Sequence, residues 1–272
     1  MSMFTQEELY KQLEALGAPQ GSVIHVHTSL REIGPAEGRG EGILDVLRCY
    51  FTADGGLLTV PTHTWKNLAD LSKPTMEVTS PETSIGTLPN LAAVHPAGLR
   101  SLHPTHSMAV FDSEEGEGRA AAFVRHDDAP VSSTDPVGCY GRLLEEGGQI
   151  LLLGVTHNRN TFMHCIEEIL DVPNRLSPEP VAATVKLPDG EILERPIRHH
   201  RAEGIQDVSA NFPKYEPAFR KHGVIREGRF GRATAKLCDA RGIAKVMQMI
   251  YERSEGKELL ADDKPLDPRY YS

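Results

Sequence analysis

Residues 22–60 alternate between strand-like and helix-like patterns, and this alternation limits the chain to a few fold classes. Ser22–His27 has the density of β-branched residues that is typical of a buried strand. A glycine-rich loop leads to Ile43–Tyr50, whose apolar residues recur at helical spacing. Leu57–Val60 is then a second strand, which Pro61 ends. This order is typical of α/β proteins with parallel neighbouring strands, whose functional groups gather at the carboxyl ends of the strands.

The most apolar strand of the chain is predicted at Gln149–Gly154, and a helix follows it over Thr161–Leu170. After Pro173 the pattern changes. Val181–Leu187 and Ile192–Ile197 flank a turn and predict a hairpin, and a further helix is expected over 231–241.

These patterns together predict a single α/β domain over residues 1–272. We expect a mixed, largely parallel central sheet flanked by helices over about residues 1–172. A small antiparallel β and helical appendage over 173–272 is expected to pack on that core.

The charge balance excludes some partners. With 38 acidic against 29 basic side chains the net charge is -9, which disfavours binding to nucleic acid or to an anionic membrane surface and suits a cationic substrate. Acidity that serves only solubility is the alternative.

The N-terminus lacks the pattern of a signal peptide, no apolar run approaches membrane-spanning length, and the four cysteines show no CxxC spacing. A cytoplasmic protein is therefore expected, as a monomer or a homodimer.

His164 stands out among twelve histidines because it begins the helix that follows the most apolar strand. Glu167 and Glu168 come three and four residues later, on the same helical face. A carboxylate beside an imidazole selects one tautomer and raises the basicity of the ring, as a general base for an amine requires. An exposed histidine–glutamate pair without catalytic role is the alternative.

Thr28 and Ser29 lie between the first strand and an expected helix start. Their hydroxyl and backbone N–H groups are suitable donors for a developing oxyanion or for the amides of a cofactor. Simple helix capping by the same residues is the other interpretation.

A metal-dependent hydrolase is a competing hypothesis. His25 and His27 at a strand end resemble the metal-binding pair of amidohydrolases, with His103 or His106 as later ligands. That fold requires regular βα repeats and a late-strand aspartate, and neither is evident in the sequence.

Four sequence motifs are spread along most of the chain. The motifs are His27–Gly34, Val60–Thr64, Ser101–Ser107 and Asn160–Glu167, with Gly147–Gly154 as the strand before the last. In their order and approximate intervals they resemble the aminoglycoside 3-N-acetyltransferase family, and the similarity runs from about Leu9 to Ala240. The segment Asp135–Leu143 is a looser version of a family motif, and Cys165 stands where an aliphatic residue is usual.

The resemblance implies an α/β fold distinct from the GNAT acetyltransferases, with acetyl-coenzyme A as co-substrate and no metal. The implied reaction is acetyl transfer to the 3-amino group of a 2-deoxystreptamine aminoglycoside, which confers antibiotic resistance; a non-antibiotic amine as acceptor is the alternative within the family. His164 would be the catalytic base, Glu167 its orienting partner and Thr28 the donor to the oxyanion. The implied coenzyme A contacts are Thr28, Ser29, Leu30, Arg31, His103 and Ser107, and the expected contacts to the cationic substrate are Glu168, Asp171, Asp112 and His63.

Overall fold

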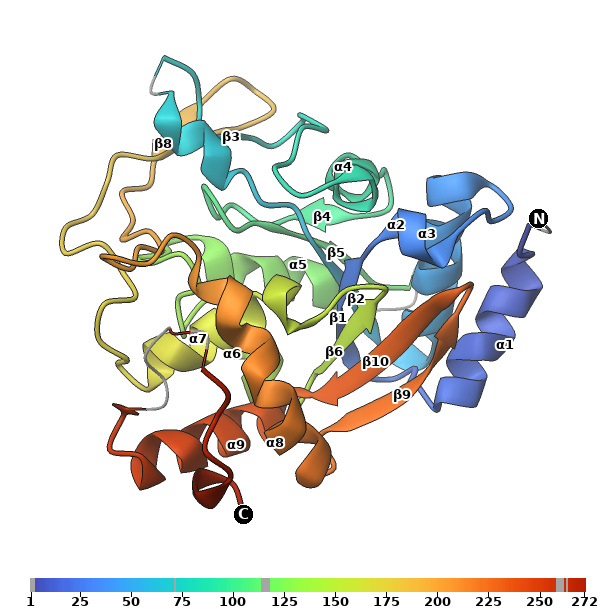
Figure 1. Cartoon of the computed structure of the whole chain (residues 1–272). Coiled ribbons are helices and arrows are strands. Elements are labelled where there is room, and N and C mark those ends of the chain that lie inside the picture. Colours follow the sequence, from blue (N-terminus) through green and yellow to red (C-terminus); the bar gives the residue numbers. More distant parts are fainter. Residues whose placement is uncertain (1–2, 71, 114–117, 258–261, 263) are drawn as a thin grey trace.

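A seven-stranded sheet lies at the centre of the computed structural model, with helices on both of its faces (Figure 1). The structure describes residues 3–70, 72–113, 118–257, 262 and 264–272. Within these ranges, no helix has both the length and the apolar character needed to cross a bilayer.

The central strand β1 is parallel to both of its neighbours, β2 and β6, whereas the outer pairs of the sheet are antiparallel. The predicted mixed α/β sheet is confirmed, with the difference that parallel pairing is limited to these three strands. In spatial order the strands are β4 (Leu99–Arg100), β5 (Met108–Phe111), β2 (Leu57–Pro61), β1 (Val23–Thr28), β6 (Gln149–Leu153), β10 (Ala233–Asp239) and β9 (Ile225–Phe230).

Both faces of the sheet are buried under helices. Successive strand residues point to opposite sides, so neighbouring residues of one strand join different apolar clusters. In β6, Ile150 and Leu152 join one apolar cluster, whereas Leu151 and Leu153 join the other. The first cluster is covered by α5 (Arg119–Val124), α6 (Cys139–Glu145), α7 (Phe162–Ile169), α8 (Glu216–Lys221) and α9 (Ala240–Arg253). The second is covered by α1 (Gln6–Leu16), α3 (Arg39–Phe51) and α4 (Thr87–Ala93).

The predicted hairpin of the C-terminal third is confirmed as β7 (Thr184–Lys186) and β8 (Ile192–Glu194), which are antiparallel. It forms a separate three-stranded sheet with β3 (Met76–Glu77), which pairs with β7 in parallel. The loop after β2 therefore lies against the C-terminal third of the chain.

The helix predicted over 231–241 is wrong, because most of this segment is strand β10, paired with β6. Ala233, Ala235 and Leu237 are buried, whereas Thr234 between them is exposed. This period-two burial suits a strand, and pairing with β6 and β9 outweighs the helical preference of alanine. Segments after residue 172 consequently complete the central sheet and are not only an appendage on it.

Candidate active site

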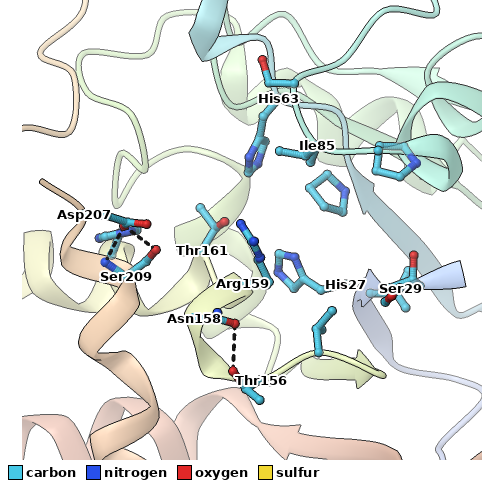
Figure 2. A pocket seen from close by; sticks show the side chains of 18 of the residues that line it. His27, Ser29, His63, Ile85, Thr156, Asn158, Arg159, Thr161, Asp207 and Ser209 are labelled. Atoms are coloured by element: carbon cyan, nitrogen blue, oxygen red, sulfur yellow. Dashed lines mark hydrogen bonds between the residues drawn. The ribbon is translucent and has the colours of Figure 1, made fainter. Parts of the chain in front are cut away.

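A large pocket, about 1820 Å³ in volume, opens at the carboxyl ends of the three parallel strands. His27 and Ser29 border it at the end of β1, His63 after β2, and Arg159 after β6. Figure 2 shows these side chains around one common space. This is the edge of the sheet where α/β proteins bind their ligands.

Gly154 directs the chain from β6 into the pocket wall. Its φ of 69° lies in the left-handed region, and a Cβ there would lie 2.6 Å from the Cβ of Glu32. Glycine satisfies both constraints because it has no side chain. The chain then passes through a 3₁₀ turn, His157–Arg159, before α7 begins.

His164 on α7 lines the pocket and is paired with a buried carboxylate. Its Nδ1 lies 3.0 Å from Oε2 of Glu167, and Nε of Arg175 donates to the other oxygen of Glu167 at 2.6 Å. The side chains of Glu167 and Arg175 are 2% and 4% exposed. An ionised carboxylate only accepts hydrogen bonds, so Nδ1 carries the proton of the neutral ring. Nε2 of His164 is therefore the nitrogen able to accept a proton.

A second histidine, His200, packs against His164 with 4.2 Å between ring centroids and 34° between the ring planes. Phe212 covers His164 as well, with 4.6 Å between centroids. Sequence reasoning missed both His200 and Arg175. They lie in an irregular part of the chain, outside the family motifs, and no periodic pattern marks them.

Glu168, predicted as a substrate contact on the rim, is instead buried in the pocket wall. Its carboxylate accepts from the hydroxyl of Ser132 and from the N–H and hydroxyl of Thr134 at 3.0 and 2.5 Å. Nε2 of His200 lies 3.3 Å away. Burial opposes ionisation, but the bonds from His200, Ser132 and Thr134 outweigh it and lower the pKa of Glu168.

Two further imidazoles, those of His106 and His63, follow His200 along the pocket. Ring centroids of His200 and His106 are 5.0 Å apart, and those of His106 and His63 are 4.5 Å apart. Burial lowers the pKa of His200 to about 4 and that of His27 to about 3. It also holds the pKa values of His63 and His106 well below their usual range. These rings are therefore neutral near pH 7 and able to accept hydrogen bonds.

The four predicted coenzyme A contacts at the end of β1 and directly after it, Thr28 to Arg31, all line the pocket. Ser29 also caps the short helix α2 (Leu30–Ile33), since its Oγ accepts from the N–H of Glu32 at 3.4 Å. Its own N–H donates to the carbonyl of Leu153 at 2.9 Å. The N–H of Ser29 is thus engaged in the fold.

His103 and Ser107, also predicted as coenzyme A contacts, do not lie among the described residues that line the pocket. Nε2 of His103 donates to the carbonyl of Ser132 at 2.8 Å, while its Nδ1 accepts from backbone N–H groups. Ser107 donates to the carbonyl of Thr62 at 3.0 Å. Both side chains hold the loops that form the pocket wall.

Two further predicted substrate contacts lie elsewhere. Asp112 accepts from the N–H of Ala120 at 2.9 Å and so stabilises the start of α5, and Asp171 follows the end of α7. Only His63 of the predicted substrate contacts lies among the described pocket residues. The carboxylates that line the pocket are Glu32, Asp207 and Glu227. Asp207 accepts from Ser209 at 2.9 and 2.6 Å (Figure 2).

The histidines proposed for a metal-dependent hydrolase lie close together, with 4.7 Å between the ring centroids of His25 and His27. Nδ1 of His25 donates to the hydroxyl of Thr59 at 2.8 Å, because that hydroxyl donates to the carbonyl of Ile24. Within the described ranges, no three potential ligands gather in a metal-binding arrangement. The geometry does not support the hydrolase hypothesis.

The buried neutral histidines predict acid destabilisation. Burial lowers the pKa of His27 to about 3 and those of His157 and His200 to about 4, from 6.5. Between these values the unfolded chain binds protons that the folded chain does not, so stability falls as the pH drops below 6.5. Each ring contributes about 1.4 kcal/mol per pH unit in that window. Denaturant unfolding at several pH values measures the slope.

The variant His157→Gln measures the contribution of a single ring to this slope. His157 suits the test because it is buried but is not among the described residues that line the pocket. It is expected to reduce the slope by about 1.4 kcal/mol per pH unit. A free energy of unfolding that stays constant from pH 6.5 to 4.5, about two units, contradicts the prediction.

Three comparisons with known proteins agree with one another. Residues 25–252 match the family model described as aminoglycoside 3-N-acetyltransferase. Aminoglycoside N(3)-acetyltransferase IV from Salmonella sp is 30% identical over 239 residues, covering 87% of this chain and 83% of the relative. Among solved structures, the apoenzyme of aminoglycoside acetyltransferase AAC(3)-IVa superposes with a TM-score of 0.75 at 26% identity, covering 100% of this chain and 92% of the other. A mutant of that enzyme in complex with a gentamicin gives 0.74 at 25% identity, covering 94% and 91%.

Proposed function

Because the chain belongs to the aminoglycoside 3-N-acetyltransferase family and is an acyltransferase, we propose that it acetylates the 3-amino group of a 2-deoxystreptamine aminoglycoside, with acetyl-coenzyme A as the donor. The observation that carries the proposal is the His164–Glu167 pair in a large pocket at the end of the parallel strands. A mutant of a structural neighbour binds a gentamicin, which supports an aminoglycoside as acceptor. Such acetylation confers antibiotic resistance.

His164 acts as the general base in this proposal. Its Nε2 takes a proton from the amine as the nitrogen attacks the thioester carbonyl, and Glu167 stabilises the imidazolium that forms. Formation of the new N–C bond gives a tetrahedral intermediate, and collapse of this intermediate breaks the C–S bond. The proton then passes from His164 to the departing thiolate, which leaves as coenzyme A. The hydroxyl of Thr28, which lines the same pocket, donates to the oxyanion.

In this proposal the two substrates bind to different parts of the pocket. Thr28, Ser29, Leu30 and Arg31 contact coenzyme A from the end of β1. Asp207 offers a carboxylate to an ammonium group of the acceptor, and His63 offers a neutral imidazole. His63 is thus kept from the predicted contacts to the polycation, and Asp207 takes the place of Glu168, Asp171 and Asp112.

A cytoplasmic location is part of the proposal. All four cysteines are free thiols, and three of them are buried. Unpaired cysteines are typical of proteins in a reducing compartment.

A thiol-release assay with acetyl-coenzyme A and a panel of aminoglycosides tests the proposed reaction. We expect acceptor-dependent release of coenzyme A, with one acetyl group added to the 3-amino position as shown by NMR of the product. Reactions without acceptor give the background of thioester hydrolysis. Release with simple amines but with no aminoglycoside would assign the chain a non-antibiotic acceptor.

A further inference from the structure

Two histidine–carboxylate pairs lie side by side in the pocket wall. Glu167 contacts His164 at 3.0 Å, and its neighbour Glu168 contacts His200 at 3.3 Å. The two imidazoles are in contact but tilted, with 4.2 Å between centroids and 34° between planes. The catalytic scheme above uses only the first pair.

The hydrogen bonds define the tautomer of His200. The single hydrogen of the Thr134 hydroxyl goes to Oε1 of Glu168 at 2.5 Å. That hydroxyl therefore accepts from Nε2–H of His200 at 3.0 Å, and Nδ1 of the neutral ring carries no proton. His164 is arranged in the same way, with one nitrogen bound toward a carboxylate and the other able to accept a proton.

The net charge of this cluster favours the uptake of one proton. Glu167, Glu168 and Arg175 are all nearly buried, and with both imidazoles neutral they carry one net negative charge. One added proton neutralises the cluster. A second would leave an uncompensated positive charge in a buried site, which is costly.

Among the described residues, two further rings pack against this histidine pair. Phe212 lies 4.6 Å from His164, and His106 lies 5.0 Å from His200, both between ring centroids. His63 and His103 lie beyond His106. Burial holds the pKa values of His63 and His106 well below their usual range, so both rings are neutral.

We propose that the two neighbouring imidazoles and the two carboxylates accept a single proton as a unit, and that Glu168 and His200 are positioning residues that stabilise protonated His164 during the reaction. The proposal rests on the proposed role of His164 as the general base. The proton travels from the amine nitrogen to Nε2 of His164 and then to the thiolate sulfur. Glu168 and His200 act on this path through charge and packing, without bonding to either substrate.

The variant Glu168→Gln tests the charge of the second pair. Glutamine has the same shape, and its carbonyl oxygen can still accept from Thr134. Its NH2 group takes the place of the oxygen that accepts from Ser132 and donates to that hydroxyl instead, and the negative charge is lost. We expect kcat at pH 7 to fall about tenfold, and the acid limb of the pH–kcat profile to move about one unit toward lower pH. The control is Glu203→Gln, which removes an exposed carboxylate outside the cluster and should leave the profile unchanged.

The variant His200→Phe separates packing from proton sharing. Phenylalanine keeps an aromatic ring against His164 but has no nitrogen. We expect kcat to fall several-fold with an unchanged KM for acetyl-coenzyme A. In the unaltered enzyme, NMR of the imidazole nitrogens should show the first titration of both rings at the same midpoint, as coupled sites require.

Three results would overturn the inference: an unshifted acid limb in folded Glu168→Gln, a kcat of His200→Phe equal to that of the unaltered enzyme, or separate first midpoints of the two rings. The activity of His164→Ala distinguishes this failure from failure of the proposed function. If His164→Ala is inactive while the Glu168→Gln profile is unshifted, only the second pair loses its role. If His164→Ala is fully active, the proposed base and this inference fail together.

Discussion

Replacing His164 by alanine is expected to lower kcat by about two to four orders of magnitude while the affinity for coenzyme A is largely kept. Nε2 of this ring is the proposed proton acceptor, and alanine offers no substitute. Coenzyme A is proposed to bind at the end of β1, through Thr28 to Arg31, which the substitution leaves intact. Steady-state kinetics give kcat, and calorimetric titration with coenzyme A gives the affinity.

The matched control is His126→Ala, which removes an exposed histidine outside the pocket lining. Its kcat should equal that of the unaltered enzyme. A near-normal kcat for folded His164→Ala would exclude this residue as the general base. A large loss of coenzyme A affinity without loss of kcat would assign it a binding role instead.

Replacing Arg175 by methionine is expected to lower the free energy of unfolding by about 3–5 kcal/mol. The guanidinium donates to Glu167 at 2.6 Å, and both side chains are nearly buried. Methionine leaves the carboxylate in place without its charged partner. Urea denaturation followed by circular dichroism measures the change.

The double variant Glu167→Gln with Arg175→Met should recover part of this loss, because the buried charge is then absent. Lys257→Met provides the comparison for an exposed ion pair, since Lys257 and Glu255 are 70% and 80% exposed. That substitution should leave the free energy of unfolding nearly unchanged, because solvent screens an exposed pair. Equal losses for Arg175→Met and Lys257→Met would show that the buried pair contributes no more than a surface pair.

The local patterns of the chain are sufficient to predict the parallel core of the sheet and one histidine–carboxylate pair. Apolar runs and glycine positions predict β1, β2 and β6, because a buried strand requires apolar residues throughout its length. His164 and Glu167 are three residues apart in a helix, so their contact follows from helical geometry alone. The parallel order then places the pocket at the carboxyl ends of these strands.

The other half of the site depends on segments that meet only in the folded chain. Arg175 and His200 reach Glu167 and His164 from an irregular stretch whose path has no periodic signal. Glu168 follows Glu167 directly in sequence, yet it points to Ser132 and Thr134. Adjacent helical residues diverge by about 100° around the axis, so the packing of distant segments decides which partner each glutamate meets.

The sequence alone determined which residues have the chemistry of a base, a carboxylate partner and an oxyanion donor, because these properties belong to single side chains and short spacings. Only the tertiary structure decided which of the predicted contacts line the pocket, since burial and charge pairing depend on every element packed around a residue. Asp112, His103 and Ser107 show the difference, because their polar groups support loops and helix ends instead of facing the pocket. The same physical reason explains β10, where pairing with the distant strand β6 and with the preceding strand β9 outweighs local helical preference.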